Sequence, residues 1–194
     1  MREDKIIILD THAILHRFYH ALPRLESPSG VPTQAVYGLV NILIKIIDEY
    51  KPIQFFACLD RPEQTIRHTL YKEYKGTRPK TTEDFSVQIA LSKKVFEKFN
   101  VPFFEKSGYE AEDLIGSIIE KIKDKTDAQI IVVTGDLDTL QLVKGDKVVV
   151  YLLRKGFSEI DVYNENRVIE RFGFLPKFLP DYKALIGDQS DNIK

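Results

Sequence analysis

Apolar residues along the chain form two kinds of pattern, short continuous runs and longer stretches with helical spacing. The runs predict buried strands, because strands covered on both faces of a sheet are apolar throughout. The spaced stretches carry apolar residues three and four positions apart, which predicts amphipathic helices. The expected strands are 5–9, 53–59, 101–105, 130–134 and 147–153, and the expected helices are 11–22, 33–50, 87–99, 111–122, 137–143, 168–172 and 178–186.

This alternation of strands and helices predicts an α/β fold with a mostly parallel central sheet and helices on both faces. The extra apolar residues Ile42, Ile44 and Ile46 suggest that helix 33–50 is buried on most sides. Right-handed crossovers place the carboxyl ends of all parallel strands at one edge. Ligands of such sheets bind in the crevice outside that edge.

Acidic residues stand where the expected strands end. Asp10, Asp60 and Asp136 each follow a buried run, so the fold brings them to one edge of the sheet. Further acids fall at other element boundaries. The full set of candidate carboxylates is Asp10, Asp60, Glu110, Glu112, Asp113, Asp136, Asp138, Asp188 and Asp191.

Taken singly, each acidic group has an ordinary structural explanation. Acids in the first turn of helix 111–122 favour the helix dipole, and Asp136 can cap a helix within its turn. Asp188 and Asp191 could belong to an exposed polar terminus. Gathered at one edge, however, several carboxylates repel one another unless a counterion is present. Hard divalent cations solve this problem with oxygen ligands.

The sequence therefore predicts a site for two Mg²⁺ ions, for which Mn²⁺ can substitute, and no organic cofactor. Two such ions stabilise the attacking and leaving oxygens of a phosphoryl transfer. The histidines His12, His16 and His20 recur at helical spacing, but without a HExxH-type carboxylate they are expected to form a partly exposed helix face. Cys58 is the only cysteine, which excludes a disulfide framework and a cysteine-based zinc site.

Composition changes the picture only slightly. The 194 residues are 43% hydrophobic and 29% charged, as expected for one folded domain, and the net charge is −1. No apolar run approaches the roughly 18 residues of a membrane span, and the N-terminus does not resemble a signal peptide. A cytoplasmic protein without a membrane partner is expected.

Charge is nevertheless unevenly distributed. Six basic residues lie between Arg61 and Lys80 against two acids, and Tyr71 and Tyr74 are interleaved with them. Such a segment can bind a nucleic-acid backbone and stack on bases, although a solvated charged helix has the same composition. Its position just after Asp60 favours the functional interpretation.

Five motifs, in order, resemble those of the 5′-nuclease (flap endonuclease) family. They are ILDTHAILHRFYHAL, FFACLDRPEQTIRHTLYKEYKGTRP, GYEAED, VVTGDLDTLQL and LIGDQSDNI. The chain is most similar to the N-terminal 5′–3′ exonuclease domain of bacterial DNA polymerase I and its free-standing homologues. The resemblance covers essentially all of residues 1–194 and implies a PIN-like catalytic core with a helical arch at about 61–85.

The resemblance also implies roles for individual residues. Ligands of the first metal would be Asp10, Asp60, Glu110 and Glu112. The second metal would be held by Asp136 and Asp138, with Glu112 shared, Asp188 and Asp191 contributing, and Asp113 acting through water. Lys75 and Arg78 would be catalytic cations on the scissile phosphate. DNA contacts would come from Arg17, Arg67, Tyr74, Lys75 and Arg78.

The implied activity is metal-dependent hydrolysis of DNA at a 5′ flap, nick or RNA primer, in replication and repair. A DNA polymerase, fused or separate, is the implied protein partner. In the family, a helix–hairpin–helix-like DNA-binding segment follows SDNI; the resemblance implies that residues 1–194 are the catalytic core without this segment, and Lys194 stands where Pro is common.

Three alternatives to a flap nuclease share part of this pattern. A PIN-type ribonuclease would share the fold and the acidic edge. A truncated DNA-binding module would have little activity. A DxD phosphatase would require a second Asp after the first strand, where His12 stands instead.

Overall fold

A six-stranded sheet in the order β3-β2-β1-β4-β5-β6 forms the centre of the computed structural model, which describes residues 4–155 and 159–194. Neighbouring strands are parallel except for the antiparallel pair of β5 and β6. The strands are β1 (Lys5–Asp10), β2 (Gln54–Cys58), β3 (Phe103–Phe104), β4 (Gln129–Thr134), β5 (Val148–Lys155) and β6 (Glu159–Tyr163). The expected mostly parallel PIN-like α/β fold is confirmed.

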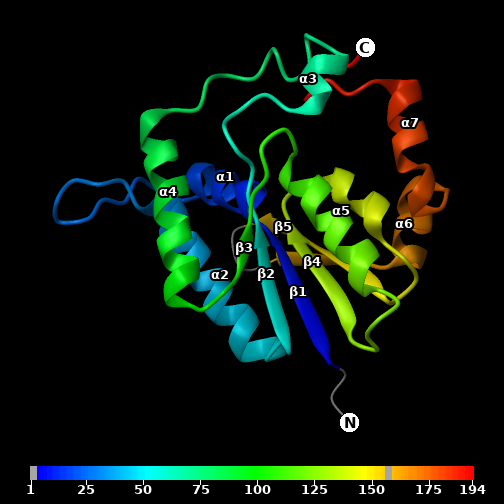
Figure 1. Cartoon of the computed structure of the whole chain (residues 1–194), viewed down its shortest axis with the longest axis horizontal. Helices are drawn as coiled ribbons and strands as arrows, with labels where there is room; N and C mark the ends of the chain where they lie inside the picture. Colours follow the sequence, from blue (N-terminus) through cyan, green and yellow to red (C-terminus); the bar gives the residue numbers. More distant parts are fainter. Residues whose placement is uncertain (1–3, 156–158) are drawn as a thin grey trace.

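Helices cover both faces of this sheet (Figure 1). One face packs against α1 (Thr11–Ala21), α2 (Gln34–Tyr50) and α4 (Glu83–Lys98). The other packs against α5 (Ala111–Ile122), α6 (Glu165–Phe172) and α7 (Leu179–Ile186). Successive residues of β1 alternate between the two cores, with Ile7 and Leu9 in the first and Ile6 and Ile8 in the second. This division explains why the strand is apolar at every position.

The helices α1 and α2 approach each other closely at Gly38. A Cβ atom at this position would lie 2.2 Å from Cγ of Phe18, which is fully buried. Only glycine therefore fits here without displacing the aromatic ring.

Five details differ from the expectations. The strand β6 was not predicted, and α4 begins at Glu83 rather than at 87 because the side chain of Thr82 accepts a hydrogen bond from the backbone N–H of Phe85. Helix α2 is buried on one side only, since Ile44 is 46% exposed while Ile42 and Ile46 are buried. The expected helix 137–143 is a 3-10 helix, η1 (Leu137–Leu142), and a second one, η2 (Pro176–Phe178), precedes α7.

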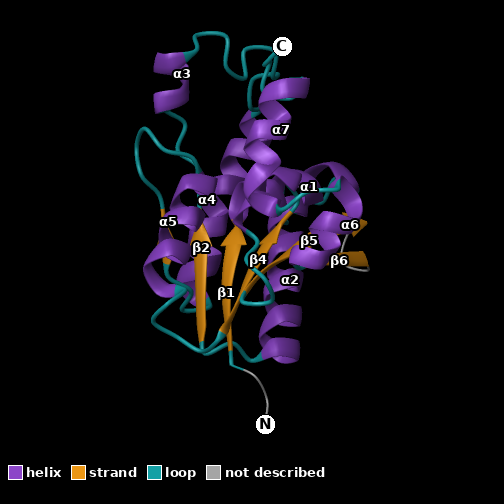
Figure 2. Cartoon of the chain, turned by 90° about the vertical axis from the view of Figure 1, so that its right-hand side faces the viewer, coloured by secondary structure: helices purple, strands orange, loops and turns teal. Residues whose placement is uncertain are grey.

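The carboxyl ends of the parallel strands all meet at one edge of the sheet. Figure 2 shows the arrowheads of β1, β2 and β4 pointing toward α3 (Ile66–Leu70) and α7, with the C-terminus beside them. The segment 61–82, hereafter the strap, crosses this edge; in it only α3 is helical, and turns and extended chain make up the rest. No helix in the described ranges is both long enough and apolar enough to cross a membrane.

Candidate metal and nucleic-acid site

Asp10, the last residue of β1, forms the floor of the site. Its Oδ1 accepts a hydrogen bond from the N–H of Ala13 and so caps α1, while its Oδ2 accepts one from the Thr134 hydroxyl at 2.7 Å. The side chain is 4% exposed. Burial, together with the negative charges of Asp60 and Asp136, raises the pKa of Asp10 to about 7, although the hydrogen bonds from Thr134 and Ala13 act in the opposite direction.

Asp60 follows the end of β2 and lies at the same edge of the sheet. Its Oδ1 accepts a 2.6 Å hydrogen bond from the N–H of Ala111 at the start of α5. Its own N–H donates to Nδ1 of His12 at 3.3 Å, which fixes that imidazole beside the carboxylate. One carboxylate thus connects the end of β2 to the first residue of α5.

Glu110 connects this edge to the strap. It is the N-cap of α5, and its carboxylate accepts hydrogen bonds from Nζ of Lys75 at 2.9 Å and from the Tyr74 hydroxyl at 3.1 Å. Lys75 adopts a left-handed backbone (φ 54°), sparsely populated for residues with a side chain. The Tyr74 ring, expected to stack on a base, is 6% exposed in this arrangement. That role stays a prediction.

Asp113 lies in the first turn of α5 and pairs with Arg67 of α3. The guanidinium donates to both carboxylate oxygens, at 2.7 and 2.8 Å, and the same carboxylate accepts from the N–H of Glu110. Burial opposes ionisation, but these bonds keep the pKa of Asp113 below its ordinary value. Asp113 and Arg67 therefore hold the strap and α5 together.

The turn after β4 carries Asp136 and Asp138. Asp136 caps η1 by accepting a hydrogen bond from the N–H of Asp138 at 2.9 Å. The carboxylate of Asp138 forms an ion pair with Lys183 of α7. Burial raises the pKa of Asp138 despite that ion pair, and the nearby Asp136 adds to the increase.

The loop after α7 contributes the last two candidate ligands. Nζ of Lys183 also forms an ion pair with the Asp188 carboxylate at 2.7 Å. Burial of this carboxylate opposes its ionisation, but the interactions with Lys183 and Ser190 outweigh burial and lower the pKa of Asp188 to about 2. Asp191 accepts a 2.7 Å hydrogen bond from Arg78 of the strap, and its backbone carbonyl accepts from the N–H of Lys75. The terminal loop and the strap are therefore in direct contact.

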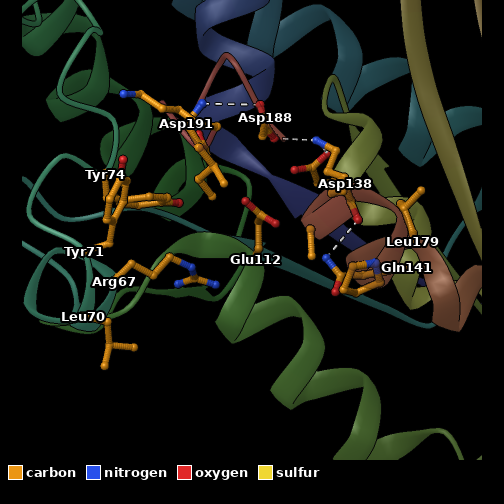
Figure 3. A pocket seen from close by; sticks show the side chains of 15 residues that line it. Arg67, Leu70, Tyr71, Tyr74, Glu112, Asp138, Gln141, Leu179, Asp188 and Asp191 are labelled. Carbon is orange, nitrogen blue, oxygen red and sulfur yellow. Dashed lines mark hydrogen bonds and ion pairs between the residues drawn. The ribbon is translucent and has the colours of Figure 1, made fainter. Parts of the chain in front are cut away.

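Glu112 differs from the other acids because it forms no hydrogen bond or ion pair within the described residues. Its side chain points into a pocket between the strap and the 136–138 turn (Figure 3). Burial, together with the charges of Asp136, Asp10 and Asp138, raises its pKa to about 8, although the more distant charge of Lys75 acts in the opposite direction. With no basic side chain within ion-pair distance, this carboxylate lacks the close counterion that its ionised form requires.

Two hollows meet at these acids. The larger, of about 880 Å³, extends from the carboxylates of β1, β2 and α5 to the histidine face of α1. The smaller, of about 680 Å³, has walls that include Leu70, Tyr71 and Leu179. Glu112, Asp138 and Asp191 line both. Arg17 lines the larger hollow, and its buried Nε has no hydrogen-bond partner.

The structure therefore brings all nine predicted acids into one neighbourhood, directly or through their basic partners. In the described ranges no three acidic, histidine or cysteine side chains stand close enough to enclose one metal ion. Five of the acids, Glu110, Asp113, Asp138, Asp188 and Asp191, instead pair with a basic residue from the strap or α7. The donor set suits a hard divalent cation, since it consists of oxygen ligands and includes the uncompensated Glu112.

Sequence reasoning missed Lys183 and Asn192, and for Tyr71 it foresaw base stacking but not a hydrogen bond to the terminal loop. The hydroxyl of Tyr71 donates to the carbonyl of Asn192 at 3.1 Å, and the Asn192 amide donates to the carbonyl of Glu73 at 2.9 Å. One signal for Lys183 was available, because it is the only basic residue in α7 and lies five positions before Asp188.

A mostly parallel sheet with acids gathered at its carboxyl edge is the architecture of the PIN-like nucleases. The chain belongs to the family of 5′–3′ exonuclease N-terminal, resolvase-like domains, whose family model matches residues 5–173. DNA polymerase I of Caldicellulosiruptor bescii is 39% identical over 190 residues, which are 97% of this chain and 22% of that protein. A 5′–3′ exonuclease of Aquifex aeolicus is 35% identical over 97% of this chain and 63% of its own length.

The chain thus spans about a fifth of the polymerase and under two thirds of the exonuclease. Solved structures have the same fold. A bacteriophage T5 5′-exonuclease with bound zinc ions superimposes with a TM-score of 0.76 and 24% identity, over 98% of this chain and 69% of that one. Flap endonuclease-1 of Methanococcus jannaschii superimposes with a TM-score of 0.62 and 16% identity, over 98% and 66% of the two chains.

Proposed function

We propose that the protein is a metal-dependent 5′ nuclease that hydrolyses DNA phosphodiesters at a 5′ flap, nick or primer end. The observation that carries the proposal is Glu112, whose carboxylate stands among Asp10, Asp136 and Asp138 without a basic partner. Family membership supports the same chemistry, because the relatives are DNA polymerase I and a 5′–3′ exonuclease. A DNA polymerase is the proposed protein partner.

Two divalent ions, Mg²⁺ or Mn²⁺, fit the carboxylates on both sides of Glu112. The first would be held by Asp10, Asp60, Glu110 and Glu112. The second would be held by Asp136 and Asp138, with Glu112 shared and Asp188 and Asp191 contributing. When bound, such ions supply positive charge to the phosphate and to the attacking water. The basic residues that now pair with these acids would then be released.

The strap supplies the remaining groups. Lys75 and Arg78 have their cationic ends at Glu110 and Asp191, so a phosphate above these acids lies within reach of both. Charge on the phosphoryl oxygens would be offset there. Arg67 and Arg17 are further candidates for backbone phosphates, and Tyr74 for a base once its ring is uncovered.

The test is cleavage of a 5′-labelled flap duplex in Mg²⁺ or Mn²⁺, beside the matched single strand and its RNA counterpart. We expect cutting near the junction that EDTA and Asp136→Asn both abolish. Preferential cutting of single-stranded RNA would favour a PIN-type ribonuclease instead. No cutting and no binding of Mg²⁺ by calorimetry would refute the enzymatic proposal.

A further inference from the structure

The histidine face of α1 lies in the larger hollow, opposite the acids. His12, His16 and His20 all line this cavity. The Nε2 atoms of His16 and His20 are 3.2 Å apart, so one ring donates a hydrogen bond to the other. His12 is engaged with Asp60 and is set apart from this pair. The proposed nuclease chemistry leaves His16 and His20 without a role.

No acid neutralises this end of the hollow. In the part of the chain that the structure describes, neither His16 nor His20 has a carboxylate within ion-pair distance, and each is the other's polar partner. The edge of the Phe85 ring from α4 packs against His16, with centroids 5.9 Å apart. The Tyr19 hydroxyl on the same helix is bonded to Thr82.

The charged groups that face the pair are all basic. Burial lowers the pKa of His16, and the nearby His20, Arg78 and His12 lower it further. Lys80 lines the same hollow and has no ion pair among the described residues. Arg78 is paired with Asp191, so Lys80 is the cation at this end of the hollow that lacks an acidic partner among the described residues. An unpaired cation in a hollow attracts an anion.

We propose that His16 and His20, together with Lys80, form a binding subsite for a phosphate group of the nucleic-acid strand. This inference rests on the proposed function, since the strand is the one whose cleavage occurs at the acids. The hollow has a volume of about 880 Å³, within the range of about 300–1,000 Å³ that is typical of ligand pockets. It therefore has room for one phosphate at the histidines and for another at the acids. The phosphate is either a 5′-terminal monoester or an internal diester.

The hydrogen bond between the His16 and His20 rings limits how they can bind a phosphate. One Nε2 donates the hydrogen bond and the other accepts it, so the accepting ring carries its proton on Nδ1 and has none on the Nε2 atom that faces its partner. A phosphate that accepts from both rings requires the accepting ring to change tautomer or take up a proton. An imidazolium donates the stronger, charge-assisted bond, so binding is expected to tighten as the pH falls from 8 to 6.

The experiment measures binding of fluorescein-labelled flap duplexes by anisotropy in Ca²⁺, with a 5′-phosphate or a 5′-hydroxyl on the flap. The double variant His16→Phe, His20→Phe removes both donors and keeps two planar rings. The corresponding double Gln variant keeps donors that cannot be protonated. Lys80→Ala is compared with Lys121→Ala, which removes one charge at the exposed end of α5.

We expect the Phe variant to weaken binding about tenfold at pH 6, the effect of one charge-assisted hydrogen bond. The Gln variant should lose less affinity and lose its dependence on pH. Weakening confined to the 5′-phosphate duplex identifies the terminal monoester, and equal weakening of both duplexes identifies an internal diester. Thermal unfolding checks that each variant is folded.

Unchanged affinity of a folded Phe variant for both duplexes would overturn the subsite. Equal losses in Lys80→Ala and Lys121→Ala would also overturn it, because they indicate general electrostatics. The outcome is separable from the nuclease proposal, since binding is measured without cleavage. A protein that neither cuts DNA nor binds Mg²⁺, but loses affinity in the Phe variant, would refute the nuclease proposal and retain the subsite.

Discussion

Replacing Glu112 with glutamine should stabilise the metal-free protein at neutral pH. The carboxyl has its ordinary pKa of 4.5 when unfolded and a pKa of about 8 when folded. A raised pKa means that the folded state keeps its proton longer, so stability is fully present below pH 4.5 and is lost as the pH rises toward 8. Glutamine carries no charge and escapes this loss.

The size of this stability loss follows from the interval between the unfolded pKa of Glu112 and the pH of the measurement. At about 1.4 kcal/mol per pH unit, the distance from 4.5 to pH 7 amounts to about 3 kcal/mol. Asp10 and Asp136 interact with the same carboxyl, so part of this loss of stability persists at those two acids in the variant. Glu112 makes no hydrogen bond within the described residues that glutamine would break. We therefore expect Glu112→Gln to gain about 1–3 kcal/mol at pH 7.

The assay is urea unfolding followed by circular dichroism in EDTA at pH 7 and pH 4. The two proteins should differ at pH 7 and agree at pH 4. Glu97→Gln makes the same change on the exposed side of α4 and should stay within about 0.5 kcal/mol of wild type at both. Millimolar Mg²⁺ should stabilise the wild type more than the variant. A Glu112→Gln variant no more stable than wild type at pH 7 would refute this reasoning.

Three further predictions concern stability and can be measured by urea unfolding. Gly38→Ala should lose about 2–4 kcal/mol, because its Cβ would overlap the Phe18 ring; a loss below 0.5 kcal/mol would show that the helices separate easily. Asp188→Asn should lose about 1–2 kcal/mol at pH 7, and the difference should vanish as the pH falls through about 2, where the wild-type carboxyl is protonated. Arg67→Lys should lose about 1 kcal/mol, because lysine cannot bind both oxygens of Asp113; equal stability would indicate that the paired geometry is unimportant.

The sheet and the position of the acids could be predicted because both depend on local patterns. Continuous apolar runs ended at Asp10 and near Asp60 and Asp136, and parallel topology then required a common edge. The strand β6 escaped notice because its burial does not follow a simple pattern: only Tyr163 is fully buried, at the end of a short segment that contains two acids.

The pairing of charges could not be predicted. Lys75 binds Glu110 across 35 residues, and Arg78 binds Asp191 across 113. Any of several cations could have paired with any of several acids on the basis of charge alone. The choice depends on the left-handed backbone at Lys75 and on the path of the strap, which are properties of the folded chain.

The strap and the terminal loop are joined by hydrogen bonds, so together they border the acids. Hydrogen bonds from Tyr71, Lys75 and Arg78 reach residues 190–192, and Asn192 returns one to Glu73. The side-chain bonds among them lie at the surface, so we expect them to belong to the least stable part of the fold. Backbone amides of 74–78 and 191–193 should therefore exchange with solvent together, as one cooperative unit that opens while the sheet beneath it remains intact.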